Sequence, residues 1–474
     1  MSSQNIKPIT IPPELEAQMT PAVRAFVGIL LDRIAKLEAR VEELERGRLT
    51  PQNSSLPPSS QHPHARPQPQ RGKSKKKRGG QPGHEKHERP LIPSEQCDEV
   101  QSLKPSECRR CGAKLAGSDR EPLRHQVWEL PEIKPIVREY QRHRLCCPHC
   151  GEMTCAELPA GVPCGQSGPR LIAFATILMA YFRQSKRRTA LFLGSLLNQP
   201  CCPSLVVKMQ TLATAAVRPS YQELAAELPK QDRLGGDESP TKEGKSKAWL
   251  WTLVAPKFTV FAMRRTREAT VLDELLTDQF AGVVTCDRAK MYWRLGRLQW
   301  CWAHLVRDFQ ALIDRGNAQT KRLGYDLRRA AQTLFRHWSD YRRGLISWAA
   351  VQRRLAPVRR DVERLLRRGL ASGNRQMQGM CRELYEHRGW LWTFSRFRGV
   401  EPTNNASERA LRHAVIWRKL SFGVQSAGGS RFVETMLTVI ETCRQQGRHL
   451  LSFLTAAVQS HLARQPAPSL LPGV

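Results

Sequence analysis

Three separated acidic residues indicate the chemistry of this sequence. Asp237 lies in the segment 234–240 (LGGDESP), Asp287 follows the apolar run 283–286, and Glu408 lies in the segment 404–409 (NNASER). The first two acids lie at or beside the ends of runs typical of strands, and the third lies in a segment with helical periodicity. Carboxylates brought together from two strands and one helix can hold two divalent cations, which suits cutting and rejoining a phosphodiester backbone.

Neighbouring acids leave alternatives for the first ligand. Glu238 directly follows Asp237, and Asp232 lies a few positions before it. Because successive residues of a strand face opposite sides, only one of Asp237 and Glu238 can face the site. Asp287 lies at the carboxyl end of a buried strand, which is where open sheets place their ligands.

The segment around Glu408 predicts a capped helix with basic residues beyond it. Its cap residues would be Asn404, Asn405 and Ser407, which precede the acid and are of the types that favour helix starts. One turn after Glu408, Arg412 shares its helical face. The candidate DNA-phosphate contacts on this segment are Arg412, Arg418 and Lys419.

A Cys-x-x-His pair lies between the second and third acids. Cys301 and His304 have a spacing that suits a metal ion only if another pair completes the site, and Cys443 and His449 are conceivable partners. The pattern favours a structural role. In an alternative interpretation, His304 and Arg307 flank the scissile phosphate.

Two Cys-x-x-Cys-Gly turns predict a structural zinc site. Their cysteines are Cys108, Cys111, Cys147 and Cys150, and four thiolates in two such pairs can enclose one Zn²⁺ ion. The segments 124–130 and 136–140 predict a β-hairpin between the turns. Nearby alternatives for the ligands are Cys97, Cys146, His149 and Cys155. Such an ion would give a small module a core that it could not otherwise bury.

The composition favours a polyanionic partner. The 474 residues, enough for two to four domains, include 75 Lys and Arg against 43 Asp and Glu, a formal net charge of +32. This surplus favours nucleic acid first and an anionic membrane second, and the alternative is a solvated basic surface. No signal-peptide pattern is visible, and the longest nearly apolar stretch, 171–182, is too short to span a bilayer. We therefore expect a cytoplasmic protein that does not enter a membrane and whose 14 cysteines are thiols or metal ligands.

The N-terminal part predicts a coiled coil followed by a basic arm. Residues 20–48 form a heptad pattern, which favours self-association as a dimer over a helix packed on its own domain. Residues 51–92 predict a disordered basic linker that follows DNA phosphates, the alternative being a solubilising linker. The heptad positions are Val23, Val27, Leu30, Ile34, Leu37, Val41 and Leu44, and the basic run comprises Arg71, Lys73, Lys75, Lys76, Lys77 and Arg78.

The remaining chain predicts a multidomain α+β protein. A zinc-binding module (93–165) and a helical, DNA-binding region (166–232) precede a catalytic core. The core's first part (233–302) is separated from its C-terminal part (399–462) by an all-α insertion (303–398), because 121 positions between Asp287 and Glu408 exceed an ordinary connection. The proline-containing tail (463–474) predicts disorder.

Together these blocks resemble the transposases of the insertion sequence 66 family, the large protein of those bacterial elements. The resemblance extends from the heptad helix to about residue 455. It includes segments 53–60 and 78–84, both cysteine turns, Asp237-Glu238, 249–251, 301–304, 404–409, 418–423 and 441–443. Where the family usually has threonine after the first Asp-Glu, this chain has Ser239 and Pro240, which leaves the metal ligand unaffected.

The resemblance implies an RNase H-like core with a DDE triad formed by Asp237, Asp287 and Glu408. It implies Mg²⁺ as the physiological metal, with Mn²⁺ as a substitute, and terminal inverted repeats as the substrate. It also implies a nucleoid-associated location in the bacterial cytoplasm and two smaller partner proteins of the same element.

We therefore expect a DNA transposase that cleaves element ends and transfers the freed 3′-hydroxyl into target DNA. One alternative is an RNase H-like nuclease that cuts without joining, which end-joining products would distinguish. The other is a zinc-containing DNA-binding protein derived from an inactive transposase, for which Asp287→Asn would leave every function intact.

Overall fold

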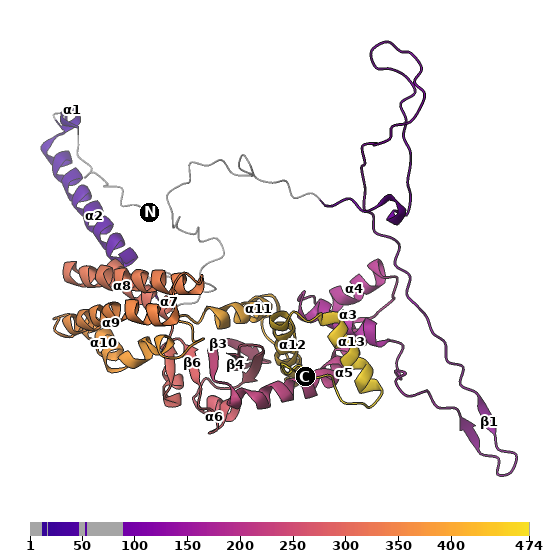
Figure 1. Ribbon diagram of the computed structural model, residues 1–474. Coiled ribbons are helices and arrows are strands. Elements are labelled where there is room, and N and C mark those ends of the chain that lie inside the picture. The colour runs from indigo at the N-terminus through magenta and orange to yellow at the C-terminus, as the bar shows by residue number, and fades with distance from the viewer. Residues whose placement is uncertain (1–11, 17, 47–52, 55–88, 474) are drawn as a thin grey trace. The chain divides into compact units, whose positions relative to one another are not determined.

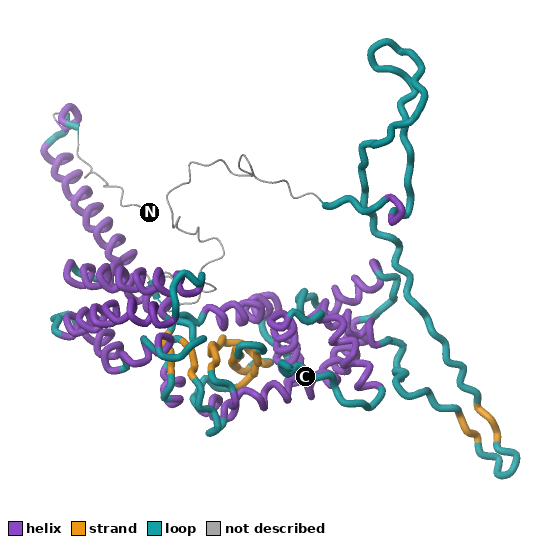
Figure 2. The backbone as a smooth tube through the Cα atoms, in the orientation of Figure 1, coloured by secondary structure: helices purple, strands orange, loops and turns teal. Residues whose placement is uncertain are grey.

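The structure, a computed structural model, describes residues 12–16, 18–46, 53–54 and 89–473. It divides into two units that are considered separately. The first unit, described over 89–134, has little regular structure: a 3₁₀ turn at Ser94–Gln96 and a bridge between Glu107 and Lys114 (Figure 2). The second unit contains every other element given below.

The N-terminal helices are α1 (Pro13–Glu16) and α2 (Pro21–Arg46). α2 is continuous through the predicted heptads, so the predicted helix is confirmed. The described heptad side chains include Leu30, Leu37 and Val41, which are 43%, 60% and 55% exposed. A coiled coil formed through this apolar stripe remains a prediction.

The second cysteine turn lies within a short antiparallel hairpin formed by β1 (Arg144–Cys146) and β2 (Met153–Cys155). Neither 124–130 nor 136–140 forms a strand among the described residues. Because the two segments belong to different units, the predicted hairpin between them remains a prediction.

A five-stranded mixed sheet lies at the centre of the second unit. Its spatial order is β5-β4-β3-β6-β7, with β3, β4 and β5 antiparallel and with β6 and β7 parallel to β3. The strands are β3 (Arg233–Glu243), β4 (Ser246–Val254), β5 (Thr259–Arg264), β6 (Val283–Cys286) and β7 (Leu298–Trp300), and α6 (Thr270–Leu276) connects β5 to β6. The runs beside Asp237 and Asp287 that were predicted as strands form β3 and β6, and β3 continues six residues beyond Asp237.

Four helices of the predicted insertion lie beside the β6–β7 end of the sheet (Figure 1). They are α7 (Trp302–Arg315), α8 (Ala318–Arg342), α9 (Trp348–Leu370) and α10 (Arg375–Glu386). Asn317, Ser347 and Asn374 begin the last three helices, and each side chain accepts a backbone N–H. The predicted all-α insertion is confirmed as a helical segment between the strands and the helix of Glu408.

The helices before and after the core pack together beside the β5 end of the sheet (Figure 1). α3 (Pro169–Ala180) and α5 (Pro203–Glu227) contact α12 (Ala427–Gln446) and α13 (Leu450–Leu462), while α4 (Lys186–Leu196) packs on α5. Leu178, Val217, Val439 and Val458 belong to one buried cluster. Residues 166–232 are therefore not a separate module, because their apolar faces are buried against the C-terminal helices.

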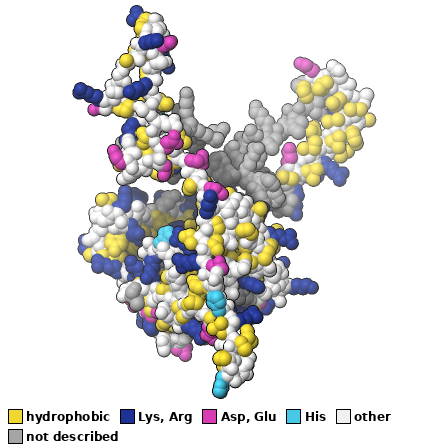
Figure 3. Space-filling view, turned by 90° about the vertical axis from the view of Figure 1, so that its right-hand side faces the viewer, with side chains coloured by type: hydrophobic (Ala, Val, Ile, Leu, Met, Phe, Trp, Pro, Cys, Tyr) yellow, Lys and Arg dark blue, Asp and Glu magenta, His cyan; other side chains and the backbone are white. Residues whose placement is uncertain are grey.

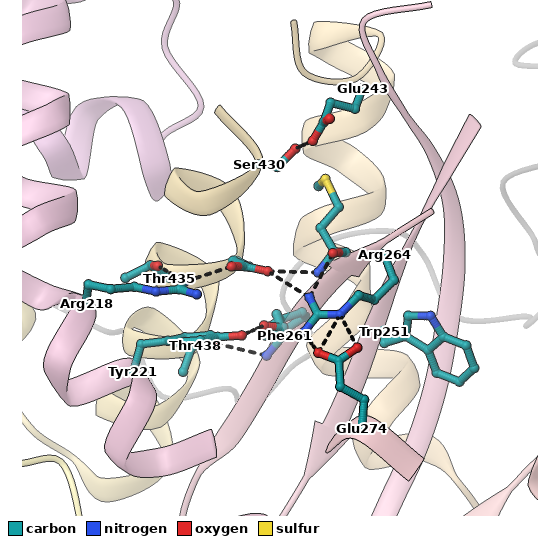
Figure 4. A network of polar contacts seen from close by, with 12 residues as sticks. Arg218, Tyr221, Glu243, Trp251, Phe261, Arg264, Glu274, Ser430, Thr435 and Thr438 are labelled. Atoms are coloured by element: carbon teal, nitrogen blue, oxygen red, sulfur yellow. Dashed lines mark hydrogen bonds and ion pairs between the residues drawn. The ribbon is translucent and has the colours of Figure 1, made fainter. Parts of the chain in front are cut away.

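Helix α12 covers the edge strand β5 with hydrogen-bonding side chains. Side-chain acceptors four residues apart on α12 are separated by about 6 Å along the helix axis. This is close to the distance between every second residue of a strand. The pairs are Thr442 with the N–H of Thr259 (3.2 Å), Thr438 with that of Phe261 (2.9 Å), and Glu434 with that of Met263 (2.9 Å). Arg218 of α5 donates to Glu434 at 2.7 Å (Figure 4). The sheet edge thus forms no exposed ladder here.

The predicted disordered tail is wrong. Leu470 is fully buried, and the Pro468 carbonyl accepts the Ser220 hydroxyl at 2.8 Å. Gln446 donates to the Leu470 carbonyl at 2.8 Å. The prolines thus give an irregular segment that is ordered by packing on α5 and α12.

Basic side chains lie on several regions of the face seen in Figure 3. This distribution matches the spread of Lys and Arg along the sequence. Among the residues described, no helix combines the length and apolar character needed to cross a membrane.

Candidate active site

Gly235 lets the helix of Glu408 approach the central strand closely, and Gly236 makes room for Tyr292. That helix is α11 (Asn405–Ser421), and it packs on β3. A Cβ atom at Gly235 would lie 2.3 Å from the Ser407 hydroxyl oxygen, and one at Gly236 would lie 2.9 Å from the Tyr292 ring. The Asn404 side-chain amide donates to the Gly236 carbonyl at 2.7 Å. The Gly-Gly pair before Asp237 is therefore a sequence signal for this contact.

Asp237 lies in β3, and Asp287 directly follows the neighbouring strand β6. β3 and β6 run parallel, and their partners Arg233–Val283, Leu234–Val284 and Gly235–Thr285 keep a constant offset. Asp237 lies two residues beyond the last pair in β3, and Asp287 lies two residues beyond it just after β6, close enough for its charge to raise the pKa of Asp237. The structure thus brings the two predicted aspartates together at the carboxyl end of β6.

Glu238 faces the opposite side of β3 and is fully engaged. Its two carboxylate oxygens accept hydrogen bonds from Arg267 Nε at 2.8 Å and from the Tyr292 hydroxyl at 2.7 Å. Its side chain is 2% exposed. Glu238 therefore supports the strand, which leaves Asp237 as the acid on the α11 side.

Glu408 lies in the first turn of α11, with Arg307 and His304 of α7 beside it. Its Oε1 atom lies 3.6 Å from Arg307 Nη2 and 3.6 Å from His304 Nδ1. Burial, followed by the charges of Arg307 and Arg288, lowers the pKa of His304 to about 3. His304 is therefore neutral near pH 7, and its contact with Glu408 is not an ion pair.

The predicted side-chain capping of α11 is wrong. Asn404 begins the helix, but its side chain makes no capping hydrogen bond and instead donates to β3. Ser407 is fully buried, and its hydroxyl has no hydrogen-bond partner among the described residues. Asn404 and Ser407 lie in the contact between α11 and β3, so their side chains are not available to cap the helix.

Cys301 fixes the loop before α11. Its Sγ atom accepts the N–H of Asn404 at 3.1 Å, and burial raises the pKa of its thiol to about 11. Among the described residues, Cys301, His304 and Glu408 form the one potential metal-binding group whose ligand atoms lie within 4.8 Å of one another. Cys443 and His449 are not part of it. A protonated thiol that holds the Asn404 backbone agrees with the structural interpretation of Cys301.

The acids repel one another in a buried environment. Burial raises the pKa of Asp237 well above its usual value, and the charges of Glu238, Asp287 and Glu408 raise it further. Burial also raises the pKa of Glu408 against the opposing charges of Arg307 and Arg412. Glu408 Oε1 is buried without a hydrogen-bond partner among the described residues. Carboxylate oxygens that repel one another in a buried place fit divalent cations such as Mg²⁺.

Arg288 joins the turn after β6 to the insertion. Its guanidinium lies 2.9 Å from the Asp308 carboxylate of α7 and 2.7 Å from the Glu383 carboxylate of α10. The neighbouring Asp287 accepts the Ala289 N–H at 2.8 Å, which fixes the turn locally. Arg288 was not predicted as a site residue, although its position directly after a predicted ligand was a usable signal.

The two cysteine turns have the same backbone geometry. Gly112 and Gly151 have φ of 72° and 78°, and each donates its N–H to the first cysteine of its turn at 2.9 Å. Backbone N–H groups lower the pKa of Cys108 and Cys147. The turns with Cys108 and Cys111 and with Cys147 and Cys150 belong to different units. A zinc ion shared between them remains a prediction.

The predicted DNA contacts on α11 differ in their surroundings. Arg412 and Lys419 are exposed. Arg418 donates to the Pro240 carbonyl, and burial lowers its pKa. The basic run from Arg71 to Arg78 lies outside the described residues.

Comparison with known proteins gives the family. The Transposase IS66 family matches residues 165–431, more than half of the chain, and a family of unknown function matches residues 5–90. Uncharacterized protein y4qI of Sinorhizobium fredii is 26% identical over 46% of this chain and 44% of its own length. Uncharacterized protein y4hP of the same organism is 24% identical over 72% of this chain and 68% of its own length. The alignments thus span under half of the first relative and about two thirds of the second. The chain belongs to the IS66 family of transposases.

Proposed function

We propose that this chain cleaves DNA at the ends of its element and joins the freed 3′-hydroxyl to target DNA. The observation that supports this most strongly is that Asp287 and Glu408 lie close enough to Asp237, in the middle of β3, for their charges to raise its pKa. The mixed strand order, with three antiparallel strands followed by two strands parallel to the first, supports an RNase H-like core.

The three carboxylates would hold two Mg²⁺ ions, with Mn²⁺ as a substitute. Bound there, such ions activate the attacking oxygen and stabilise the leaving oxygen of the phosphodiester. Asp237 lies in β3, and Asp287 directly follows the neighbouring parallel strand β6. Glu408 reaches the same place from α11, whose approach depends on Gly235.

Nearby cations would position the scissile phosphate. Arg307 lies beside Glu408, and the exposed Arg412 is close enough to affect the pKa of Glu408. The neutral His304 can donate a hydrogen bond to Glu408 without adding charge. These groups would hold the DNA backbone and the carboxylate in fixed relative positions.

The other parts of the chain would bind and pair DNA ends. The basic arm and α11 supply cations for phosphates, and a zinc ion would organise the cysteine turns. The exposed apolar stripe of α2 suits a coiled coil that joins two protomers, so that both element ends are held together. Two smaller proteins of the same element are the proposed partners.

The test is a cleavage and joining assay with labelled DNA that carries the element's own ends. Wild-type protein with Mg²⁺ or Mn²⁺ should yield both nicked and joined products. Asp287→Asn should yield neither, while the matched control Asp273→Asn on α6 should behave as wild type. Cleavage without joining would favour a nuclease, and DNA binding without cleavage, with the partner proteins present, would favour an inactive DNA-binding relative.

A further inference from the structure

Phe422 is an exposed aromatic residue in an unusual backbone conformation. It directly follows α11, has φ of 56° and ψ of 22°, and is 84% exposed. Left-handed backbone is disfavoured for residues with a Cβ atom, and glycine is the usual residue at such a helix end. A residue whose backbone is strained and whose side chain is unpacked contributes little to the stability of the fold. Such a residue points to a role outside the fold.

The turn that presents Phe422 is firmly attached. The Val424 N–H donates to the Lys242 carbonyl at 3.0 Å, and the Gly244 N–H donates to the Val424 carbonyl at 2.8 Å. A Cβ atom at Gly423 would lie 2.7 Å from the Lys242 carbonyl oxygen. The hairpin between β3 and β4 therefore fixes the backbone that directly follows Phe422, while the Phe422 ring stays exposed.

The surroundings of this turn are basic. Lys419 lies one turn before Phe422, and Lys242, Lys245 and Lys247 are exposed on the hairpin to which the turn is attached. The acid of this hairpin, Glu243, is paired with Arg265 at 2.6 Å. An exposed aromatic ring among exposed basic side chains matches the chemistry of nucleic acid binding, in which a base stacks on the ring and lysines contact phosphates.

The position of the ring relates it to the candidate active site. Glu408 and Phe422 lie at opposite ends of α11, fourteen positions apart, which corresponds to about 21 Å along the helix axis. At 3.4 Å per base pair this equals about six base pairs of DNA. DNA that reaches Glu408 along α11 would pass the ring at that separation.

We propose that Phe422 stacks on a base of the element's end about six base pairs from the cleaved phosphate, and that it unstacks the duplex there. This inference rests on the proposed function. The ring acts as a wedge or platform that fixes the register of the DNA, while the lysines around it contact the backbone. A docking surface for a protein partner is the competing use of the same ring.

The test uses 2-aminopurine placed at successive positions of the element's end. Wild-type protein should raise its fluorescence at one position near the predicted distance. Phe422→Gly should abolish this signal and reduce cleavage about tenfold, although glycine relieves the left-handed backbone and should leave the melting temperature unchanged or higher. Phe422→Trp should keep both signal and cleavage. Tyr325→Ala, which removes an exposed aromatic ring from α8, should behave as wild type.

An abasic substitution at the responding position separates the outcomes. It removes the need for unstacking, so it should restore cleavage by Phe422→Gly. If wild-type protein cleaves but Phe422→Gly gives the same signal and rate, the stacking proposal is overturned. Loss of a partner protein by Phe422→Gly with unchanged DNA signal would also overturn it. If wild-type protein with its partners cleaves no end at all, the proposed function itself fails.

Discussion

Asp237 of β3 and Asp287, which directly follows the parallel strand β6, each lie two residues beyond the last paired positions, Gly235 and Thr285. The parallel register therefore brings the two carboxylates to the same side of the sheet end, where the charge of Asp287 raises the pKa of Asp237. A sheet that holds like charges so close is less stable than one without them, and a bound divalent cation removes the repulsion.

Asp237→Asn should stabilise the metal-free protein while abolishing cleavage. The substitution removes a buried charge whose pKa is raised by burial and by Glu238, Asp287 and Glu408. We expect the melting temperature in EDTA to rise by about 2–4 °C, equivalent to roughly 1 kcal/mol.

Added Mg²⁺ should raise the melting temperature of wild-type protein and have little effect on the variant. Asp278→Asn, outside the site, serves as the control. A lower melting temperature for Asp237→Asn in EDTA would contradict mutual repulsion among the acids.

Gly235→Ala should separate α11 from β3. The new methyl group would lie 2.3 Å from the Ser407 hydroxyl oxygen and 3.1 Å from the Asn404 side chain. We expect destabilisation by about 1–3 kcal/mol and a loss of cleavage, measured by chemical denaturation and by the end-cleavage assay.

Ser407→Ala should partly rescue Gly235→Ala, because it removes the hydroxyl oxygen that the new methyl group would contact. The Ser407 hydroxyl is buried without a hydrogen-bond partner among the described residues, so its removal alone should be tolerated. In Gly235→Ala combined with Ser407→Ala, part of the stability and activity should return. Equal defects in the single and double variants would show that this contact does not position Glu408.

His304 should make the protein less stable in acid. Its pKa is about 3 in the folded protein, below the usual value of 6.5, so the unfolded chain binds the proton more readily. The stability from this group is complete above pH 6.5 and is lost as the pH falls from there towards 3.

His304→Gln should therefore flatten the stability curve between pH 6.5 and 4, measured as the difference from wild type. The comparison with wild type is needed because the raised pKa of Asp237 makes the folded protein more stable as the pH falls, which opposes the effect of His304. The exposed His125→Gln is the control. Parallel curves for wild type and His304→Gln would contradict the neutral state of His304.

Arg288→Met should weaken the connection between the insertion and the turn of Asp287. Asp308 and Glu383 would each lose an ion-pair partner, and an unpaired carboxylate in a partly buried position costs about 1–3 kcal/mol. We expect about tenfold slower cleavage with unchanged DNA affinity. Arg294→Met, which removes a more exposed pair with Asp273, should have little effect. A change in affinity with normal cleavage would assign Arg288 to DNA binding instead.

The sequence predicted the strands and helices of the core because their periodicity and boundaries are local. Asp237 and Asp287 could be proposed from their places at or beside strand-like runs, with Glu238 and Asp232 as alternatives to Asp237. The strand pattern alone does not show which side of β3 meets α11 and which meets Tyr292. That relationship exists only after the helix and the sheet have packed.

The wrong predictions have one cause in common. Each concerns a segment whose structure depends on residues that are distant in the sequence. The tail was predicted to be disordered, but Leu470 is buried against helices of the second unit. β7, with three residues, is too short for a periodic signal and depends on its ladder with β6.

The measurement that tests the central claim most directly is the metal dependence of Asp287→Cys. A thiolate binds the softer Mn²⁺ better than Mg²⁺, so a true ligand replaced by cysteine changes its metal preference. We predict that Asp287→Cys is inactive in end cleavage with Mg²⁺ and regains part of its activity with Mn²⁺. Asp273→Cys should show the wild-type response to both metals. Wild-type cleavage by Asp287→Cys in Mg²⁺ would contradict the assignment of Asp287 as a ligand of the catalytic metal.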